Sequence, residues 1–311
     1  MQNQSFVTEF VILGLSQNPN VQKILFALFL LVYLATIGGN MIIVVTIIYS
    51  PALLGTPMYF FLAFLSFLDA CVSSTVTPKM IIDFLCEKKI ISFECCMTQL
   101  FSVHFFSGAE MIVLAAMAYD RYVAICKPLY YSSILTRRLC SILVAISWAG
   151  GFLHSIIQII FTLQLPLCGP NVIDHYMCDL FPLLKLACTD THIFVLLVFA
   201  NSGAICIIIF SLLLVSYGVI LFSLRAHSSE GRRKALSTCG AHVTVVVLFL
   251  VPCILIYARD TSAFSFEKNT LIFVNVLTPL LNPMVYTFRN KEMINSIKKM
   301  WRKMKVAFVK F

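Results

Sequence analysis

Two carboxyl groups lie inside long apolar stretches of the sequence, where charged side chains are rare. Asp69 is the one charged residue of LSFLDACVSS, and Glu110 is the one charged residue of FFSGAEMIVLAAM. Ionisable groups in such surroundings are costly and usually functional. Together with hydroxyls such as Ser107, the two carboxyl groups are a candidate site for a sodium ion. The alternative is that one carboxyl is protonated and both hydrogen-bond between helices, because two close carboxylates need not both ionise.

A charged pair, Asp120-Arg121, follows closely after the uncharged run 111–118. A helix rises about 1.5 Å per residue, so Arg121 is expected roughly 16 Å along the helix from Glu110. Glu110 is therefore not the partner of Arg121. The pair is expected at the end of an apolar segment, while Glu110 is expected near its middle.

The elements that must position these groups are membrane-spanning helices. Hydrophobic residues make up 60% of the 311-residue chain and charged residues 12%, and the mean hydropathy is +0.92. Soluble domains carry roughly 25% charged residues, and long apolar runs predict spanning helices. We therefore expect an all-α membrane protein with a seven-helix bundle. The predicted spans are residues 24–49, 58–82, 97–122, 139–161, 195–224, 235–258 and 269–288.

Positive charges are distributed unevenly between the two sides of this bundle. With the amino terminus outside, sixteen of the 23 Lys and Arg residues fall on the inner side, as the positive-inside rule requires. The net charge of +9 therefore suits membrane lipid and a protein partner rather than nucleic acid. Asn3-Gln4-Ser5 is an N-glycosylation acceptor on the outer side. The start, MQNQSFVTEF, lacks the basic residues of a cleavable signal peptide.

The segment 290–305, NKEMINSIKKMWRKMK, differs from the spans. Its apolar side chains recur at helical spacing, with Lys and Arg between them. This pattern predicts a short amphipathic eighth helix on the inner leaflet, and a calmodulin-type target is the alternative. We expect one domain, with an extracellular amino terminus (1–23), a helix bundle (24–288) and a cytoplasmic tail (289–311).

The motifs of an enzyme or a transporter do not occur. The sequence has no HExxH, GxSxG, P-loop or GxGxxG pattern, and its six His residues lack metal-ligand spacing. Many transporters carry an internal repeat, and none is visible in this sequence. Both classes remain alternatives to a receptor, and electrogenic flux without a G protein would indicate transport.

Seven separate motifs occur in a characteristic order along nearly the whole chain. They are Gly39-Asn40, PMYFFL at 57–62, LSFLD at 65–69, MAYDRYVAIC at 117–126, Ser216-Tyr217, KALSTC at 234–239, and PLLNPMVY at 279–286 followed by Arg289-Asn290. This ordered set resembles the olfactory receptors, within the rhodopsin-like G-protein-coupled receptors. Three positions depart from the family pattern: Cys95 stands for a usual Gly, Leu236 for a common Phe and Asp260 for a frequent Pro.

The resemblance implies a plasma-membrane receptor that binds a small volatile odorant. It also implies coupling to a heterotrimeric G protein of the stimulatory olfactory type, which raises cAMP, and disulfides Cys96–Cys178 and Cys168–Cys188. The residues alone do not assign these pairs. Five cysteines, Cys95, Cys96, Cys168, Cys178 and Cys188, are expected in outer loops, so at least one is unpaired.

The resemblance also implies a switch at the inner face. Arg121 is expected to be held by Asp120 at rest and released on activation, to line a crevice for the carboxyl-terminal helix of a G-protein α subunit. Pro283 lacks an N–H and permits a local bend in the seventh span. The alternative is an interfacial salt bridge without a switching role. The candidate switch residues are Asp120, Arg121, Tyr122, Tyr217, Asn282, Pro283 and Tyr286.

The ligand site is expected in the outward half of the bundle. Its candidate residues are His104, Ser107, Gly108, Met111, Asn201, Ser202, Ile205, Leu250, Tyr257, Ile272 and Asn275. Such an apolar lining with a few polar groups suits a small, neutral molecule. The third span has no carboxylate between Glu94 and Glu110, which argues against an amine. At roughly 0.3–0.6 kcal/mol per heavy atom, a volatile is expected to bind with micromolar affinity. His104 is either a packing or loop-orienting residue or a ligand contact.

Overall fold

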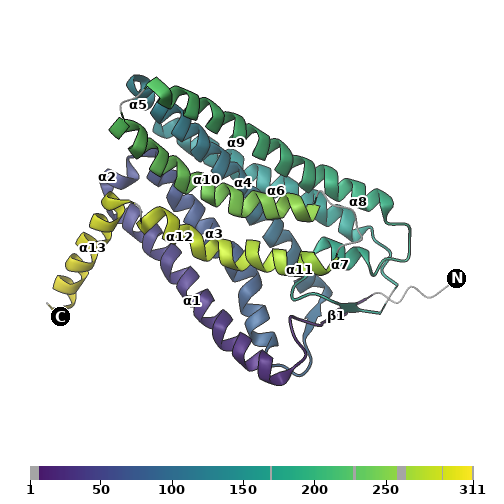
Figure 1. Cartoon of the computed structure of the whole chain (residues 1–311). Coiled ribbons are helices and arrows are strands. Elements are labelled where there is room, and N and C mark those ends of the chain that lie inside the picture. The colour runs from purple at the N-terminus through teal and green to yellow at the C-terminus, as the bar shows by residue number, and fades with distance from the viewer. Residues whose placement is uncertain (1–6, 169, 227–228, 258–263, 289, 310–311) are drawn as a thin grey trace.

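Seven long apolar helical segments run side by side in a bundle (Figure 1). The computed structural model describes residues 7–168, 170–226, 229–257, 264–288 and 290–309. By length and composition, the candidate membrane spans within these residues are Pro19–Tyr49, Pro57–Asp83, Phe93–Cys126, Arg137–Leu163, His192–Ser223, Cys239–Tyr257 and Lys268–Thr287. The expected all-α fold with seven spans is confirmed.

Five spans are single helices, and two contain a π-helical turn. The single helices are α1 (Pro19–Tyr49), α3 (Pro57–Asp83), α4 (Phe93–Cys126), α6 (Arg137–Leu163) and α10 (Ser229–Tyr257). The fifth span comprises α8 (His192–Val198), a π turn (Phe199–Gly203) and α9 (Ala204–Ser223). The seventh comprises α11 (Phe264–Ile272), a π turn (Phe273–Leu277) and α12 (Thr278–Phe288). Such turns often mark functional positions in helices.

Short helices lie at both ends of the bundle. At the end near the amino terminus, α7 (Leu180–Leu184) lies in the loop between the fourth and fifth spans. At the opposite end lie α2 (Pro51–Leu54), α5 (Tyr131–Ile134) and 3₁₀ turns at Pro128–Tyr130 and Leu224–Ala226. We call these two ends the amino-terminal end and the opposite end (Figure 1).

Several helices begin before the apolar run because polar residues cap them. The Asn18 side chain accepts hydrogen bonds from the backbone N–H groups of Asn20 and Val21, and Pro19 occupies the first helical turn. Ser92 caps α4 and Thr136 caps α6 in the same way. Caps satisfy backbone donors that the helix leaves unpaired. As a result, α1 starts five residues before the expected span 24–49.

The carboxyl-terminal helix α13 (Lys291–Val309) leaves the bundle at the opposite end (Figure 1). Asn290 begins it by accepting hydrogen bonds from the backbone N–H groups of Glu292 (3.0 Å) and Met293 (3.2 Å). The phenol of Tyr59, on α3, donates to the Glu292 carboxylate (2.9 Å) and accepts from the Asn290 amide (2.8 Å). Met293 is fully buried. The expected eighth helix is present and extends four residues beyond 305.

A three-stranded sheet lies over the amino-terminal end of the bundle. Strand β1 (Glu9–Ile12) pairs antiparallel with β2 (Ile90–Ser92) and parallel with β3 (Val172–Ile173). Phe10 and Ile12 point into the core and are fully buried. The sheet therefore joins the amino-terminal segment to the loops that follow the second and fourth spans.

Helices α4 and α6 approach each other closely at two glycines. A Cβ atom on Gly151 would lie 2.5 Å from the carbonyl oxygen of Phe105 and 2.8 Å from the amide nitrogen of Ala109. A Cβ atom on Gly108 would lie 3.2 Å from the Cα of Gly151. Small residues let membrane helices pack backbone to backbone. This contact brings the imidazole rings of His104 and His154 to 5.5 Å, centroid to centroid.

Candidate functional site

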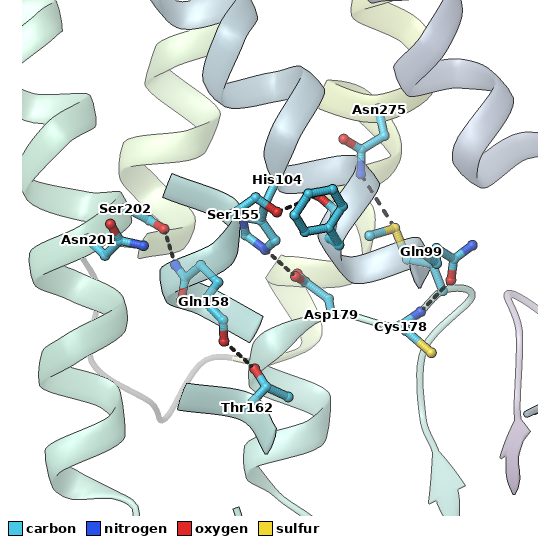
Figure 2. A network of polar contacts seen from close by, with 12 residues as sticks. Gln99, His104, Ser155, Gln158, Thr162, Cys178, Asp179, Asn201, Ser202 and Asn275 are labelled. Carbon is cyan, nitrogen blue, oxygen red and sulfur yellow. Dashed lines mark hydrogen bonds and ion pairs between the residues drawn. The ribbon is translucent and has the colours of Figure 1, made fainter. Parts of the chain in front are cut away.

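The loop after the fourth span is fastened to α4 at the amino-terminal end. A disulfide joins Cys96 to Cys178, with their Cα atoms 5.4 Å apart. The backbone N–H of Cys178 also donates to the side-chain oxygen of Gln99 at 2.9 Å (Figure 2). A second disulfide, Cys168–Cys188, closes the loop on itself. These bonds hold the residues next to Cys178 at a fixed place over the bundle.

Beneath this loop lies a small enclosed cavity of about 30 Å³. The π turns of the fifth and seventh spans contribute Ser202, Val274 and Asn275 to its wall. The remaining lining comes from α4, α6, α10, α11 and the loop. The lining residues are Val103, His104, Ser107, Met111, His154, Met177, Asp179, Ser202, Cys253, Tyr257, Leu271, Val274 and Asn275. The wall is therefore mostly apolar, with a few hydroxyl, amide, imidazole and carboxyl groups.

Three polar side chains of this wall lie against neighbouring groups. Gln158 on α6 donates to the Ser202 hydroxyl at 2.7 Å, and the Asn275 amide donates to the sulfur of Met177 at 3.5 Å (Figure 2). The Nε2 atom of His104 lies 3.5 Å from a carboxylate oxygen of Asp179. His104 thus contacts the loop, as a loop-orienting residue would, and also lines the cavity.

A larger cavity of about 840 Å³ opens at the opposite end of the bundle. Its wall carries charges of both signs and comes from α3, α4, α10, α12, α13 and the residue before α13. The lining residues are Met58, Tyr59, Leu62, Met117, Arg121, Glu230, Arg233, Ala241, His242, Val285, Tyr286, Asn290, Lys291 and Glu292. The wall therefore presents charged groups of both signs, together with apolar side chains, at the end of the bundle away from the small cavity.

Arg121 is held at the edge of this cavity by its sequence neighbour. Its guanidinium forms a salt bridge with the carboxylate of Asp120, which is fully buried. The phenol of Tyr131, on α5, donates to the second Asp120 oxygen at 2.7 Å. Burial, followed by the negative charge of Asp120, raises the pKa of Tyr131. The phenol therefore stays protonated and keeps donating to Asp120.

Two further polar contacts link helices on the way to this cavity. The Tyr217 hydroxyl, on α9, hydrogen-bonds to the Nδ1 atom of His242, on α10. Nearer the middle of the bundle, Asn282 on α12 donates to both carboxylate oxygens of Asp69, at 2.9 and 3.0 Å. The Glu110 carboxyl group lies in hydrogen-bonding contact with that of Asp69. This contact suits a shared proton or a bound cation, so the sodium ion at Asp69 and Glu110 stays a prediction.

Comparison with known proteins gives the family. A family model described as olfactory receptor matches residues 29–304. Olfactory receptor 4A47 of Homo sapiens is 54% identical over 303 residues, which cover 97% of this chain and 98% of that receptor. The chain belongs to the olfactory receptor family. Olfactory receptor 4A5 of Homo sapiens is 56% identical over 309 residues (99% and 98% covered). Olfactory receptor 4B13 of Mus musculus is 56% identical over 302 residues (97% and 99% covered).

The receptor is therefore a rhodopsin-like G-protein-coupled receptor and not an enzyme. Its family bind odorants and couple to G proteins. Membership of this family excludes the two alternatives that the sequence left open, an enzyme and a transporter.

The structure brings six of the eleven candidate ligand residues together in the small cavity. These are His104, Ser107, Met111, Ser202, Tyr257 and Asn275. The other five do not line it: Gly108, Asn201, Ile205, Leu250 and Ile272. Gly108 packs on α6, and Asn201 donates to the backbone carbonyl of His154 at 3.1 Å. Both are therefore helix-packing residues in this arrangement.

The eleven candidates all came from the third, fifth, sixth and seventh spans, and three lining residues of the cavity lie outside these spans. His154 belongs to the fourth span, and Met177 and Asp179 belong to the loop after it. Asp179 could have been found from the sequence, because a disulfide between Cys96 and Cys178 places the residue after Cys178 next to the end of α4. The candidate switch residues Arg121 and Tyr286 line the opposite cavity. Asn3, the glycosylation candidate, lies outside the described residues.

Proposed function

We propose that the receptor, as a single seven-span domain, binds a small, neutral, mostly apolar volatile in the cavity beneath the loop after the fourth span. Binding activates a heterotrimeric G protein of the stimulatory olfactory type, which raises cAMP. The observation that carries this proposal is the pair of cavities at opposite ends of one bundle. One is small, enclosed and mostly apolar, and the other is large and lined by charged residues.

The amino-terminal end faces the cell exterior in this proposal, and the protein lies in the plasma membrane. The excess of Lys and Arg on the opposite side supports this orientation. The two disulfides also support it, because both lie at the amino-terminal end and disulfides persist in oxidising compartments. On the inner side, α13 lies on the lipid surface with Trp301 exposed.

The ligand enlarges its cavity on binding. A volume of about 30 Å³ is a tenth of the roughly 300 Å³ at the small end of ligand pockets. Met111 and Met177 line the cavity, and unbranched methionine side chains adapt to new shapes more readily than branched ones. Movement of these side chains, and of the π turns that carry Ser202 and Asn275, provides the space.

Activation separates Arg121 from Asp120 and turns its guanidinium toward the G protein. At rest, Asp120 is held by two groups, Arg121 and the Tyr131 phenol. Tyr217 and His242 join α9 to α10 near this site, and Pro283 lies within α12. Tyr286 lines the cavity that the G protein enters. Tyr122 and Asn282 complete the proposed switch, with Asn282 connecting α12 to Asp69.

The test is odorant-driven cAMP in cells that express the receptor. Arg121→Ala is expected to abolish the odorant response at normal surface level. Arg138→Ala is the matched control, because Arg138 is exposed at the same end of the bundle and lies outside the cavity. An undiminished response of Arg121→Ala, with surface level measured by antibody labelling of intact cells, would refute the switch.

A further inference from the structure

Asp179 occupies an unusual place for an acidic residue. It stands directly before α7, where an aspartate side chain ordinarily caps the helix by accepting backbone hydrogen bonds. The Asp179 side chain makes no such bond. It lines the small cavity and points toward the imidazole of His104 instead (Figure 2).

Among the described residues, the carboxylate of Asp179 lacks the hydrogen bonds that burial demands. The residue is 1% exposed, and neither carboxylate oxygen has a hydrogen-bond partner among the described residues. The nearest cationic or donor group that the structure records is Nε2 of His104, at 3.5 Å. A carboxylate accepts about four hydrogen bonds, and an unmet buried acceptor is costly. Within the described part of the chain, the carboxylate therefore has acceptor capacity left over at the cavity wall.

The position of this carboxylate is fixed before any ligand arrives. The preceding residue, Cys178, is joined to α4 by its disulfide and by the hydrogen bond to Gln99. The Asp179 backbone carbonyl accepts from the Leu183 N–H at 3.3 Å. An acceptor held in this way binds a donor without a further loss of side-chain freedom.

The rest of the cavity determines which donor fits. Val103, Met111, Leu271 and Val274 present apolar surface. Removing an ammonium ion from water into such a wall costs far more than removing a hydroxyl. A neutral O–H group on an apolar body therefore matches the cavity better than an amine does. The Ser107 hydroxyl, also buried and without a hydrogen-bond partner among the described residues, provides a second polar contact.

We propose that the receptor selects volatile alcohols, whose hydroxyl donates a hydrogen bond to the Asp179 carboxylate. The inference rests on the proposed odorant site and adds the chemical class of its ligand. The sequence has no carboxylate on the third span between Glu94 and Glu110, and Asp179 of the loop after the fourth span supplies one to the cavity.

The first experiment uses the unchanged receptor and matched odorants. Straight-chain, branched and cyclic volatile alcohols are compared with their methyl ethers, aldehydes and primary amines in the cAMP assay. Losing a hydrogen bond to a charged acceptor lowers affinity by about tenfold to a hundredfold, so each methyl ether is expected to be weaker than its alcohol by that factor. Ethers or aldehydes as potent as the alcohols would overturn the proposal, and so would amines more potent than the alcohols.

The second experiment changes the acceptor. Asp179→Asn is expected to raise the half-maximal alcohol concentration about tenfold or more. It is also expected to reduce the ratio between the potency of each alcohol and that of its methyl ether. Asp174→Asn is the matched control, because Asp174 lies in the same loop, with its side chain 72% exposed, and is expected to leave the ratio unchanged. An unchanged ratio in Asp179→Asn at normal surface level contradicts the proposal. If that variant does not reach the surface, the comparison of alcohols with their methyl ethers in the unchanged receptor tests the proposal.

The two proposals fail in different ways. Silence of the unchanged receptor toward every class of odorant contradicts the proposed function. A response confined to odorants without a donor leaves that function intact and overturns the role of Asp179.

Discussion

Replacing Gly151 by alanine tests whether the contact between α4 and α6 is as close as the structure has it. The added Cβ would lie 2.5 Å from the Phe105 carbonyl oxygen and 2.8 Å from the Ala109 amide nitrogen. Both are backbone atoms of a helix, so they move only if the helices separate. Overpacking of this kind costs about 1–3 kcal/mol, and we expect the upper half of that range. Alanine favours a helix over glycine by about 1 kcal/mol. The free energy of unfolding is therefore expected to decrease by about 1–2 kcal/mol.

The assay compares thermal stability of the purified receptor in detergent with its surface level in cells. Gly38→Ala is the control, because a Cβ there has no atom within 4 Å, so only the propensity gain remains. Gly151→Ala should be less stable than Gly38→Ala and should respond to odorant more weakly, since the same contact sets the distance between His104 and His154. Equal stability of the two variants would refute the close packing.

Two further outcomes follow from groups outside the spans. Tyr131→Phe removes one of the two groups that hold Asp120, and a hydrogen bond to a charged group is worth about 1.5 kcal/mol or more. We therefore expect up to tenfold higher basal cAMP in this variant. Tyr130→Phe is the control, because Tyr130 is an exposed neighbour, and it should behave as the unchanged receptor. Burial lowers the pKa of His175 from 6.5 to about 4, so on acidification the unfolded chain takes up a proton at this residue before the folded chain does. The contribution of His175 to the free energy of unfolding is therefore complete above about pH 6.5 and decreases toward pH 4. At pH 5 the loss is about 2 kcal/mol. Thermal melting at both pH values, with His175→Gln as the variant that should lose this part of the acid sensitivity, measures the effect.

The spans and the eighth helix were predictable from the sequence because each depends on local pattern. Apolar length marks a span, and the spacing of Met293, Ile297 and Trp301 marks an amphipathic helix. Helix starts were less predictable because caps such as Asn18 lie outside the apolar run. The π turns at 199–203 and 273–277 have no simple residue pattern, since one extra residue in a helix depends on packing around it.

The candidate site was predictable only in part, for the same reason. Residues on the third span, such as His104 and Ser107, share one helical face, so periodicity found them. Asp179 reaches the cavity through a disulfide and a short helix in a loop, and no periodicity connects it to α4. His154 enters because Gly108 and Gly151 let two helices approach. A contact between helices of this kind depends on three-dimensional packing.

The three-stranded sheet has a consequence for the order of events during synthesis. Val11 emerges from the ribosome first, but its partners Ile90 and Val172 follow only after the second and the fourth spans have been made. Strand β1 therefore meets β2 only after two spans have been made and β3 only after four, and pairing of such distant segments is slow. The sheet over the amino-terminal end is therefore complete only after the fourth span has been made. A receptor stalled before that step has its first spans in the membrane and an unfinished sheet.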